Sequence, residues 1–401
     1  MSESSGGPEG VGGFGFGMDP EALRDAPLFR EMQRVMASSS GPVNWELARQ
    51  VGIASAVEAG DDAEPTDQDR RSFDEAVRVA ELHVARFTGL EAPGDVAQVR
   101  AIRRAEWINA NADSLRSLLE PAAARVSEAM DRAQREAMPT DLPPEMQAMG
   151  SLLQQLSPLL MGAQVGSVLG FLAQRVLGQY DVAVPRSGPG AVLFVVPNIR
   201  RFETDWSLDR TDFRTWVALH EVTHRFEFAR PWARERFTTL LDDFLSTLRI
   251  DVEGMQARLA TLDGADPEAL QGLLEGDEGL FATELDDEQR LKLGRIQAFM
   301  AAAEGYGDHV MHALGRELLP SYPRIDEAMR RYREGEETDP VFERLLGIEM
   351  KRSQYVDGRA FCDTVVEQTD EATLARMWES AEAMPSLPEI QEPRLWLART
   401  V

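Results

Sequence analysis

The stretch "WVALHEVTHRFEF", residues 216–228, places two histidines four positions apart, with a glutamate directly after the first. Residues four apart lie on one face of an α-helix, with about 5 to 6 Å between their Cβ atoms, so His220 and His224 can bind one ion together. Neutral imidazole nitrogens are common ligands of tetrahedral zinc. Glu221 is rotated by about 100° from His220, which places it beside the ion, where it can act as a general base.

The flanking sequence predicts that this stretch is helical. Asp209 is a suitable N-cap residue, and Asp212 follows three positions later, close to a capping box. Arg230 and Pro231 end the pattern, so we expect the helix to run to about Ala229. The alternative is that both histidines are ordinary core residues of a buried helix. A strand-like run before this helix and two further histidines after it favour the metal site.

A catalytic zinc site needs a third protein ligand and an open position for water. Glu304 lies in the apolar stretch "AFMAAAEGYGDHVMHALG", residues 298–315, where an unpaired carboxylate is costly to bury. Metal binding would account for it, so we expect Glu304 to be the third ligand. Asp308 follows one helical turn later and can accept a hydrogen bond from His220 or His224, fixing the tautomer of that imidazole.

Three other residues are alternative third ligands. His309 and His312 lie on the same predicted helix as Glu304, and His309 is also a candidate for holding substrate. Glu227 follows the second histidine of the motif by three residues, although solvent exposure explains it equally well. Glu304 is preferred because the Glu-then-Asp pair supplies both a ligand and a carboxylate behind a ligand.

The remaining sequence predicts a mainly α-helical protein with a small β element beside the active-site helix. Apolar residues recur three and four apart along most of the chain. The run 191–196 is the clearest strand; we expect it to pair with 182–184 and to offer an edge on which an extended peptide can lie. After the active-site helix we expect further helices over 232–262, near 267–274 and over 287–319.

This pattern predicts a flexible Gly-rich tail over residues 1–36, a helical lobe over 37–180 and a catalytic region over 181–401 that forms one compact unit with the lobe. Within the lobe, Gly162, Gly166 and Gly170 are spaced by four residues. Such spacing permits close helix contact in a bilayer, but prolines and polar residues interrupt the apolar run. We therefore expect a tightly packed core helix and no membrane span.

Composition excludes some partners. The 401 residues include 68 acidic and 42 basic side chains, for a formal net charge of −26, which argues against a nucleic-acid partner. Cys362 is the single cysteine and cannot form an internal disulfide, and the N-terminus lacks the features of a signal peptide. We expect a cytoplasmic protein. The sequence gives no indication of its oligomeric state.

The combination of H-E-x-x-H on one helix and E-x-x-x-D on a later one resembles the gluzincin arrangement of zinc peptidases. A closer likeness is to a mainly actinobacterial family of zinc-dependent metallopeptidases or hydrolases with a zincin-like site, some of which are linked to the biosynthesis of a deazaflavin coenzyme. It covers most of the chain, in the blocks "FGFG" (14–17), "GPVNWELARQ" (41–50), "ALHEVTHRFEF" (218–228), "EGYGDHVM" (304–311), "MKRSQYVDGRAFCDTV" (350–365) and "LPEIQEPRLWLAR" (387–399). The spacing between the second histidine and Glu304 is longer than in well-studied gluzincins.

This resemblance implies a zincin-like fold and a zinc-dependent hydrolase that cleaves peptide bonds with water activated by Glu221. It also implies a tyrosine or histidine that hydrogen-bonds the oxyanion. Tyr355 is the candidate, with Tyr306 and His309 as alternatives; the neighbouring Lys351 and Arg352 either bind a substrate carboxylate or form a solvated face. The partner is a peptide or amide substrate. The alternatives are a zinc-binding scaffold without peptidase activity and a small-molecule amidase.

Overall fold

A computed structural model of the chain describes residues 41–58, 60, 62–137, 144–179, 191–247, 286–335 and 352–400. The tail predicted for 1–36 and the short helix predicted near 267–274 lie outside these ranges. The described elements are, in order, α3 (Trp45–Glu58), α4 (Asp67–Thr88), β1 (Gln98–Ile102), α5 (Arg104–Ala137), α6 (Pro144–Ala173), β2 (Ala191–Val195), α7 (Val196–Asp205), α8 (Arg210–Phe228), α9 (Pro231–Leu245), α12 (Asp287–Leu318), α13 (Tyr322–Gly335), α15 (Arg352–Gln368), α16 (Glu371–Ala375), a 3₁₀ turn (Arg376–Trp378), α17 (Leu387–Gln391) and α18 (Pro393–Thr400). The prediction of a mainly helical fold with a small β element is confirmed.

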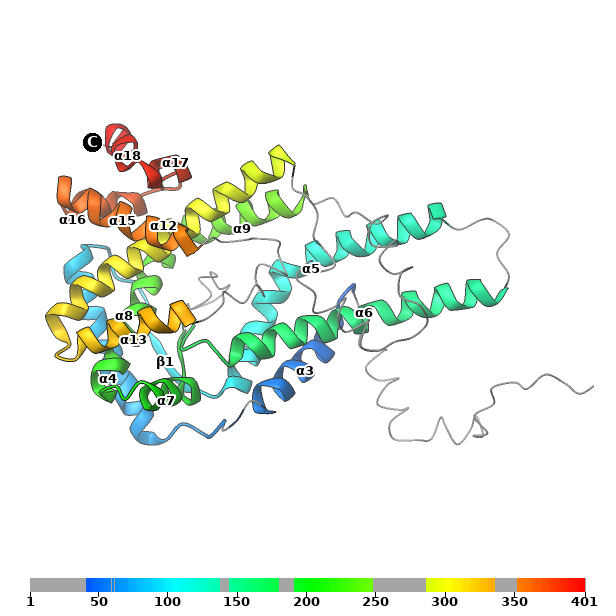
Figure 1. Cartoon of the computed structure of the whole chain (residues 1–401), viewed down its shortest axis with the longest axis horizontal. Coiled ribbons are helices and arrows are strands. Elements are labelled where there is room, and N and C mark those ends of the chain that lie inside the picture. Colours follow the sequence, from blue (N-terminus) through cyan, green and yellow to red (C-terminus); the bar gives the residue numbers. More distant parts are fainter. Residues whose placement is uncertain are drawn as a thin grey trace, which may run out of the picture.

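Helix α8 lies at the centre of this arrangement. It packs against α4 on one side and α12 on another, while α15 lies on the outer side of α12 (Figure 1). Most of its residues are buried, as expected for a helix with neighbours all round. Its start agrees with the prediction, because Asp209 caps it by accepting from the backbone N–H groups of Thr211 and Asp212 at 2.9 and 3.0 Å. The motif of residues 220–224 therefore lies in the middle of a helix that is enclosed by other helices.

Buried ion pairs fix the position of α8. Arg214 lies between Asp69 of α4, at 3.0 Å, and Glu203 of α7, at 2.7 Å, and all three side chains are buried. Further along, the buried Arg225 contacts Glu81 at 2.8 Å and Asp95 at 3.1 Å. A buried charge requires a partner of opposite sign, so each arginine restricts how α8 can rotate or slide against its neighbours.

The sheet has two parallel strands, and the sequence predicts only one of them. β2 forms where the run 191–196 predicts a strand. It ends at Val195, and α7 begins at the next residue, with a proline in its first turn. Its partner is β1, in register from Gln98↔Ala191 to Ile102↔Val195. β1 is short and only its last residue is buried, so its sequence carries little strand signal. The predicted partner, 182–184, lies outside the described ranges.

The other edge of β2 is not open along its length. Gly178 forms an antiparallel bridge with Phe194, and the backbone N–H of Val195 donates to the carbonyl of Leu177 at 2.8 Å. The expectation that β2 offers its edge to an extended peptide is therefore wrong at Phe194 and Val195, because the chain covers that edge itself. Residues 177 and 178 therefore lie alongside the end of β2.

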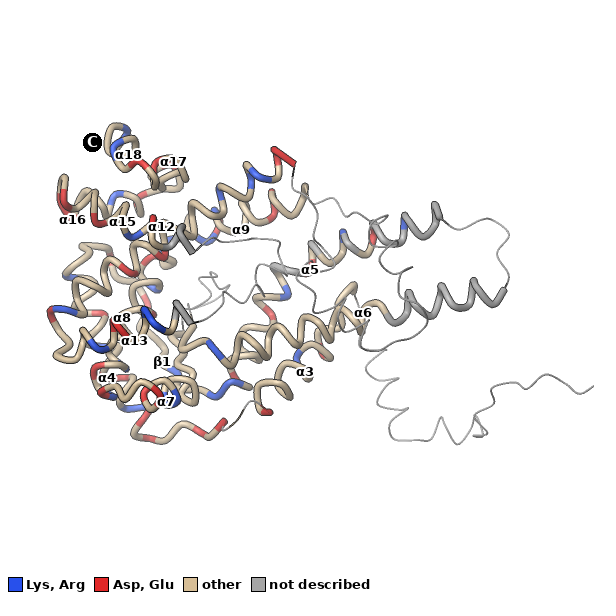
Figure 2. Tube along the Cα trace, in the orientation of Figure 1, with Lys and Arg blue, Asp and Glu red and all other residues tan. Residues whose placement is uncertain are grey.

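The glycine-spaced helix is tightly packed, as predicted. The side chains of α6 that the structure describes, residues 157–173, include no charged one (Figure 2), and the helix packs along α3. A Cβ added to Gly162 or Gly166 would lie 2.5 or 2.6 Å from a backbone oxygen of Asn44 or Ala48, so only glycine allows this approach. No helix within the described ranges combines the length and apolarity that crossing a membrane requires.

Candidate metal centre

Helix α8 presents its two motif histidines towards α12. The rings of His220 and His224 meet edge to face, with 4.6 Å between their centroids. His224 and Glu221 are fully buried and His220 is half-buried. The helical spacing predicts that the two histidines share a face, and the structure has them in contact.

Helix α12 brings Glu304 to the same place. Its Oε2 lies 3.9 Å from Nε2 of His224, although the two residues are far apart in sequence. Gly307 makes this approach possible, because a Cβ there would already lie 3.2 Å from Cε1 of the His224 ring. Gly305, next to Glu304, touches the backbone of Gly358, so α15 also crosses α12 beside the centre. Gly307 thus sets how closely α12 packs on α8, and Gly305 sets how closely it packs on α15.

Both histidines have a contact at Nδ1. Nδ1 of His224 lies 2.7 Å from Oε2 of Glu227, and Nδ1 of His220 lies 3.2 Å from the sulfur of Met311. Glu227 is fully buried, so solvent exposure does not explain it. A hydrogen bond at Nδ1 fixes the tautomer and leaves Nε2 for a ligand role.

The sequence predicts that Asp308 hydrogen-bonds one of the two histidines. In the structure, the carboxylate that contacts His224 is that of Glu227. Asp308 is half-buried on α12, one turn after Glu304, and its role stays a prediction. Glu227 and Met311 were not assigned this function from the sequence. The spacing of three residues between His224 and Glu227 is a signal that could have identified the carboxylate, since such pairs face each other on a helix.

Three carboxylates make the surroundings of His224 favourable for a cation. Burial alone would lower the pKa of His224, but the carboxylates of Glu227, Glu304 and Glu221 outweigh it and raise the pKa to about 10. Complete burial raises the pKa of Glu227 above its usual value, against the opposing effect of His224. The same field that holds a proton on the imidazole would favour a metal ion in its place.

Glu221 is held from the opposite side by the segment that follows α6. Its Oε2 accepts a hydrogen bond from the backbone N–H of Gln179 at 2.8 Å. The Gln179 side chain donates to Asn111 at 3.0 Å, and the indole N–H of Trp107 donates to the carbonyl of Gly178 at 3.1 Å. These contacts attach the Gly178–Gln179 segment to α5. Nothing in the sequence indicates them, because no motif links residues so far apart.

The two rival histidines are engaged elsewhere. Nδ1 of His309 lies 2.6 Å from Asp363 of α15, and its Nε2 lies 3.0 Å from Glu371 of α16. His312 contacts the hydroxyl of Tyr322 through Nδ1 at 2.9 Å. Since carboxylates contact both nitrogens of His309, this residue links α12 to α15 and α16 in this structure.

The two tyrosines that could bind the oxyanion lie on α15 and α12. Tyr355 belongs to α15, but its side chain and the whole of Lys351 lie outside the described part of the chain, as does the side chain of Arg352. Tyr306 is buried with its ring edge to face against Trp378 at 5.7 Å, and burial raises its pKa well above the usual value. Tyr306 is therefore a core residue. Gly358, three residues after Tyr355, is the residue that contacts α12 next to Glu304.

The donor set fits zinc. Two imidazoles and one carboxylate are the protein ligands of several catalytic zinc sites, and donors on one tetrahedral zinc lie about 3.3 Å apart given bond lengths of about 2.0 to 2.1 Å. The 3.9 Å between His224 and Glu304 is somewhat wider. Within the described ranges no three His, Cys, Asp or Glu side chains converge as a formed metal cluster. The fit therefore rests on the donor chemistry, the His224–Glu304 approach and the support behind each histidine.

Comparison with known proteins agrees with this geometry. A family model described as zincin-like metallopeptidase matches residues 43–397. A solved structure from Chloroflexus aurantiacus, described as a candidate hydrolase with a novel fold, is similar at 31% sequence identity and a TM-score of 0.65. That similarity covers 89% of this chain and 98% of the other. No curated protein matches the chain.

Proposed function

Because the chain belongs to the zincin-like metallopeptidase family, we propose that it is a zinc-dependent hydrolase that cleaves peptide bonds. The observation that carries the proposal is the approach of Glu304 to His224, which brings a carboxylate from α12 to the imidazole pair of α8. His220, His224 and Glu304 would hold the ion. Zinc bound there would supply Lewis acidity and lower the pKa of water towards neutrality.

Each other residue then has a role that follows from its position. Glu221 would accept the proton from the attacking water, and the backbone N–H of Gln179 holds its Oε2. It next delivers this proton to the leaving amine, as a general base that becomes a general acid. Glu227 keeps Nε2 of His224 directed at the ion through its contact with Nδ1.

Tyr355 and Asp308 are assigned roles from their positions on α15 and α12. We propose Tyr355 as the hydrogen-bond donor to the oxyanion, because Gly358 in the same helix contacts Gly305 beside Glu304. Asp308 is proposed as a second carboxylate behind the metal ligands. We also propose a cytoplasmic location, because a single cysteine cannot form an internal disulfide.

The test compares the wild-type protein with Glu221→Gln, both loaded with zinc, on a broad mixture of peptides. We expect chelator-sensitive cleavage by the wild type and a loss of at least about 100-fold in the variant, which keeps its zinc because Glu221 is not a ligand. Metal content is measured on the same samples. Equal turnover by the two proteins would overturn the mechanism, and an inactive but fully loaded wild type would favour a zinc-binding scaffold.

A small-molecule amidase is the second candidate. The observation that favours it is the complete burial of Glu221 and His224, because a long peptide needs an open cleft along the reacting groups. Running the same assay with short N-acyl amides separates the two. Cleavage of these amides without cleavage of peptides would replace the peptidase with the amidase.

A further inference from the structure

The segment of residues 176–179 follows the turn after α6 and ends at the candidate metal centre. Its last residue, Gln179, donates its backbone N–H to Oε2 of Glu221 at 2.8 Å. The residue before it, Gly178, lies so close to the same carboxylate that an added Cβ would overlap it. The segment therefore touches the buried carboxylate of Glu221 at two successive residues.

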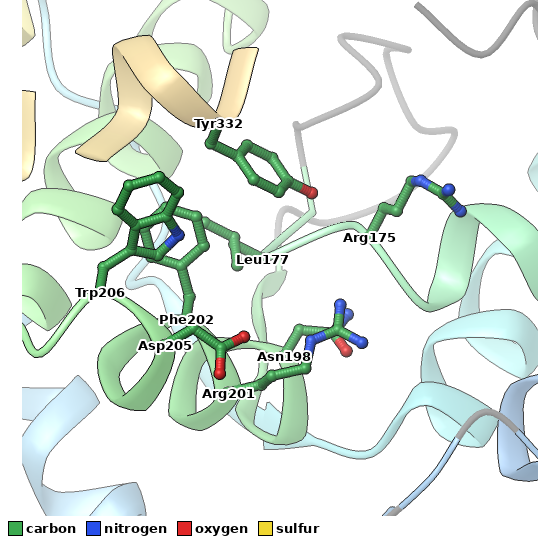
Figure 3. Close-up of a pocket in the computed structure, with 8 residues that line it drawn as sticks. All are labelled: Arg175, Leu177, Asn198, Arg201, Phe202, Asp205, Trp206 and Tyr332. Atoms are coloured by element: carbon green, nitrogen blue, oxygen red, sulfur yellow. The ribbon is translucent and has the colours of Figure 1, made fainter. Parts of the chain in front are cut away.

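The first half of the segment is held by α7 and β2. The carbonyl of Val176 accepts from the side chain of Asn198 at 2.6 Å, and the carbonyl of Leu177 accepts from the backbone N–H of Val195 at 2.8 Å. Leu177 and Asn198 also line a pocket of about 330 Å³ (Figure 3). This half of the segment thus borders a cavity on one side, and hydrogen bonds restrain it there.

The second half of the segment is held by two side chains of α5. The indole N–H of Trp107 donates to the carbonyl of Gly178 at 3.1 Å, and the Gln179 side chain donates to Oδ1 of Asn111 at 3.0 Å. Trp107 and Asn111 are both buried, and four residues apart on a helix they lie on one face. The amide N–H of Asn111 donates to the carbonyl of Trp107 at 2.9 Å, which leaves its Oδ1 directed at Gln179.

This arrangement matters for a general base because proton transfer depends on the position of the accepting carboxylate. Helix α8 fixes the backbone of Glu221, but the side chain has several rotatable bonds beyond it. The N–H of Gln179 restrains the carboxylate only as far as the segment itself is held. A displacement of about 1 Å in such a group can lower a rate on the order of 100-fold.

We propose that Trp107 and Asn111 are positioning residues of the hydrolase: they hold the Gln179 N–H against Oε2 of Glu221 and thereby fix the orientation of the general base. The proposal rests on the hydrolase function proposed above. The two side chains act through the backbone of the segment 176–179. A residue that only stabilised the fold would not affect the turnover of each folded molecule.

Hydrogen exchange tests the contact without catalysis. The exchange rate of the Gln179 backbone amide is measured by NMR on zinc-loaded protein labelled at glutamine, for the wild type and for Trp107→Phe, which keeps an aromatic ring but has no N–H. We expect exchange about 10-fold faster in the variant, because the buried carbonyl of Gly178 loses its donor and the segment opens more often.

Trp45→Phe is the matched control. Trp45 is buried on α3, and no group in the described part of the chain accepts from its indole N–H. This variant loses the same part of the ring and can lower the melting temperature, but we expect the exchange of Gln179 to stay at the wild-type rate.

Kinetics test the consequence for Glu221. With a peptide that the wild type cleaves, we expect Trp107→Phe to lower kcat by about 10-fold or more, while KM and zinc content stay at wild-type values. This split is expected because the substitution displaces the base and leaves the metal ligands in place. Trp45→Phe should keep the wild-type kcat.

Asn111→Leu is the second variant, and it decides the question if Trp107→Phe does not fold. Leucine is close to asparagine in size but offers no acceptor to the Gln179 side chain. We expect the same pattern as for Trp107→Phe: faster exchange at Gln179 and a lower kcat, with unchanged KM and zinc content.

Unchanged exchange at Gln179 in the folded variants overturns the proposal, and so does faster exchange with an unchanged kcat. A fall in kcat that is explained by loss of zinc also overturns it. If the zinc-loaded wild type cleaves neither peptides nor amides, the proposed hydrolase function fails. Faster exchange in the variants would then still show that α5 holds the Gln179 N–H on Glu221.

Discussion

Nδ1 of His224 lies 2.7 Å from Oε2 of Glu227, three residues later on the same helix, and both side chains are fully buried. The helix alone sets this geometry, since residues three apart face each other. A buried carboxylate beside one imidazole is stable only where positive charge is present. In the proposed metal site, this contact would hold Nε2 of His224 towards the ion.

Replacing Glu227 with glutamine is expected to weaken zinc binding by about 10- to 100-fold, the usual cost of losing a carboxylate behind a histidine ligand. Glutamine has nearly the shape of glutamate, but without the negative charge it no longer stabilises a positively charged imidazole or a zinc ion bound to it. Zinc affinity is measured by competition with a chromogenic chelator. Glu235→Gln on the exposed face of α9 is the control, and equal affinities for the two variants would contradict the assigned role.

Replacing Gly178 with alanine is expected to lower the rate of hydrolysis by at least about 100-fold, because the added Cβ displaces Glu221. The added Cβ would lie 2.2 Å from Oε1 and 2.4 Å from Cδ of that carboxylate, closer than atoms can approach. The measurement is turnover at saturating substrate, together with zinc content. Gly294→Ala is the matched control, since nothing lies within 4 Å of its added Cβ, and normal turnover by Gly178→Ala would refute the contact.

Replacing Gly166 with alanine is expected to lower the free energy of unfolding by about 1–3 kcal/mol, the usual cost of overpacking. Its Cβ would lie 2.6 Å from the carbonyl oxygen of Ala48 and 2.7 Å from Cβ of Val51, so α3 and α6 must separate. Chemical denaturation measures the change. An unchanged midpoint would show that the two helices do not pack as described.

Replacing His309 with glutamine is expected to destabilise the fold by about 1–3 kcal/mol near pH 6, and by less as pH rises. Burial would lower the pKa of His309, but its hydrogen bonds to Glu371 and Asp363 raise the pKa above its usual value. A group whose folded pKa is raised contributes its full stability below the unfolded pKa and loses it as pH rises through the folded pKa.

Denaturation curves of wild type and His309→Gln between pH 6 and the alkaline range provide the measurement. Asp363 also pairs with Arg359 at 3.4 Å, so the carboxylate keeps one cation in the variant. Glu371→Gln tests the same ion pair from α16 and should show the same trend. A loss of stability that is constant with pH would mean that His309 stabilises the fold by packing alone.

The features that follow from short-range spacing could be predicted from the sequence. The α8 helix, its cap at Asp209 and the shared face of His220 and His224 all depend on residues within a few positions of each other. The long helix expected over 287–319 is α12, which ends one residue earlier. The cost of burying a carboxylate indicates Glu304, and the structure has its carboxylate 3.9 Å from His224.

The features that depend on distant residues could not be predicted. β1 has a weak pattern of its own and is defined by its pairing with β2. The contact of Gln179 with Glu221 uses a backbone N–H, which every residue except proline has, so no residue type signals it. In the sequence, Glu227 looks like an exposed charged residue. It is buried because other helices pack on both sides of α8.

The centre joins three separate parts of the polypeptide: the segment at Gln179, the α8 motif and Glu304 of α12. During synthesis, a ribosome-bound chain that has emerged only as far as α8 already carries both histidines and Glu221 but lacks the carboxylate that completes the donor set. The proposed hydrolysis therefore requires α12 to have emerged and docked on α8 first, which would delay the proposed activity until the fold has formed.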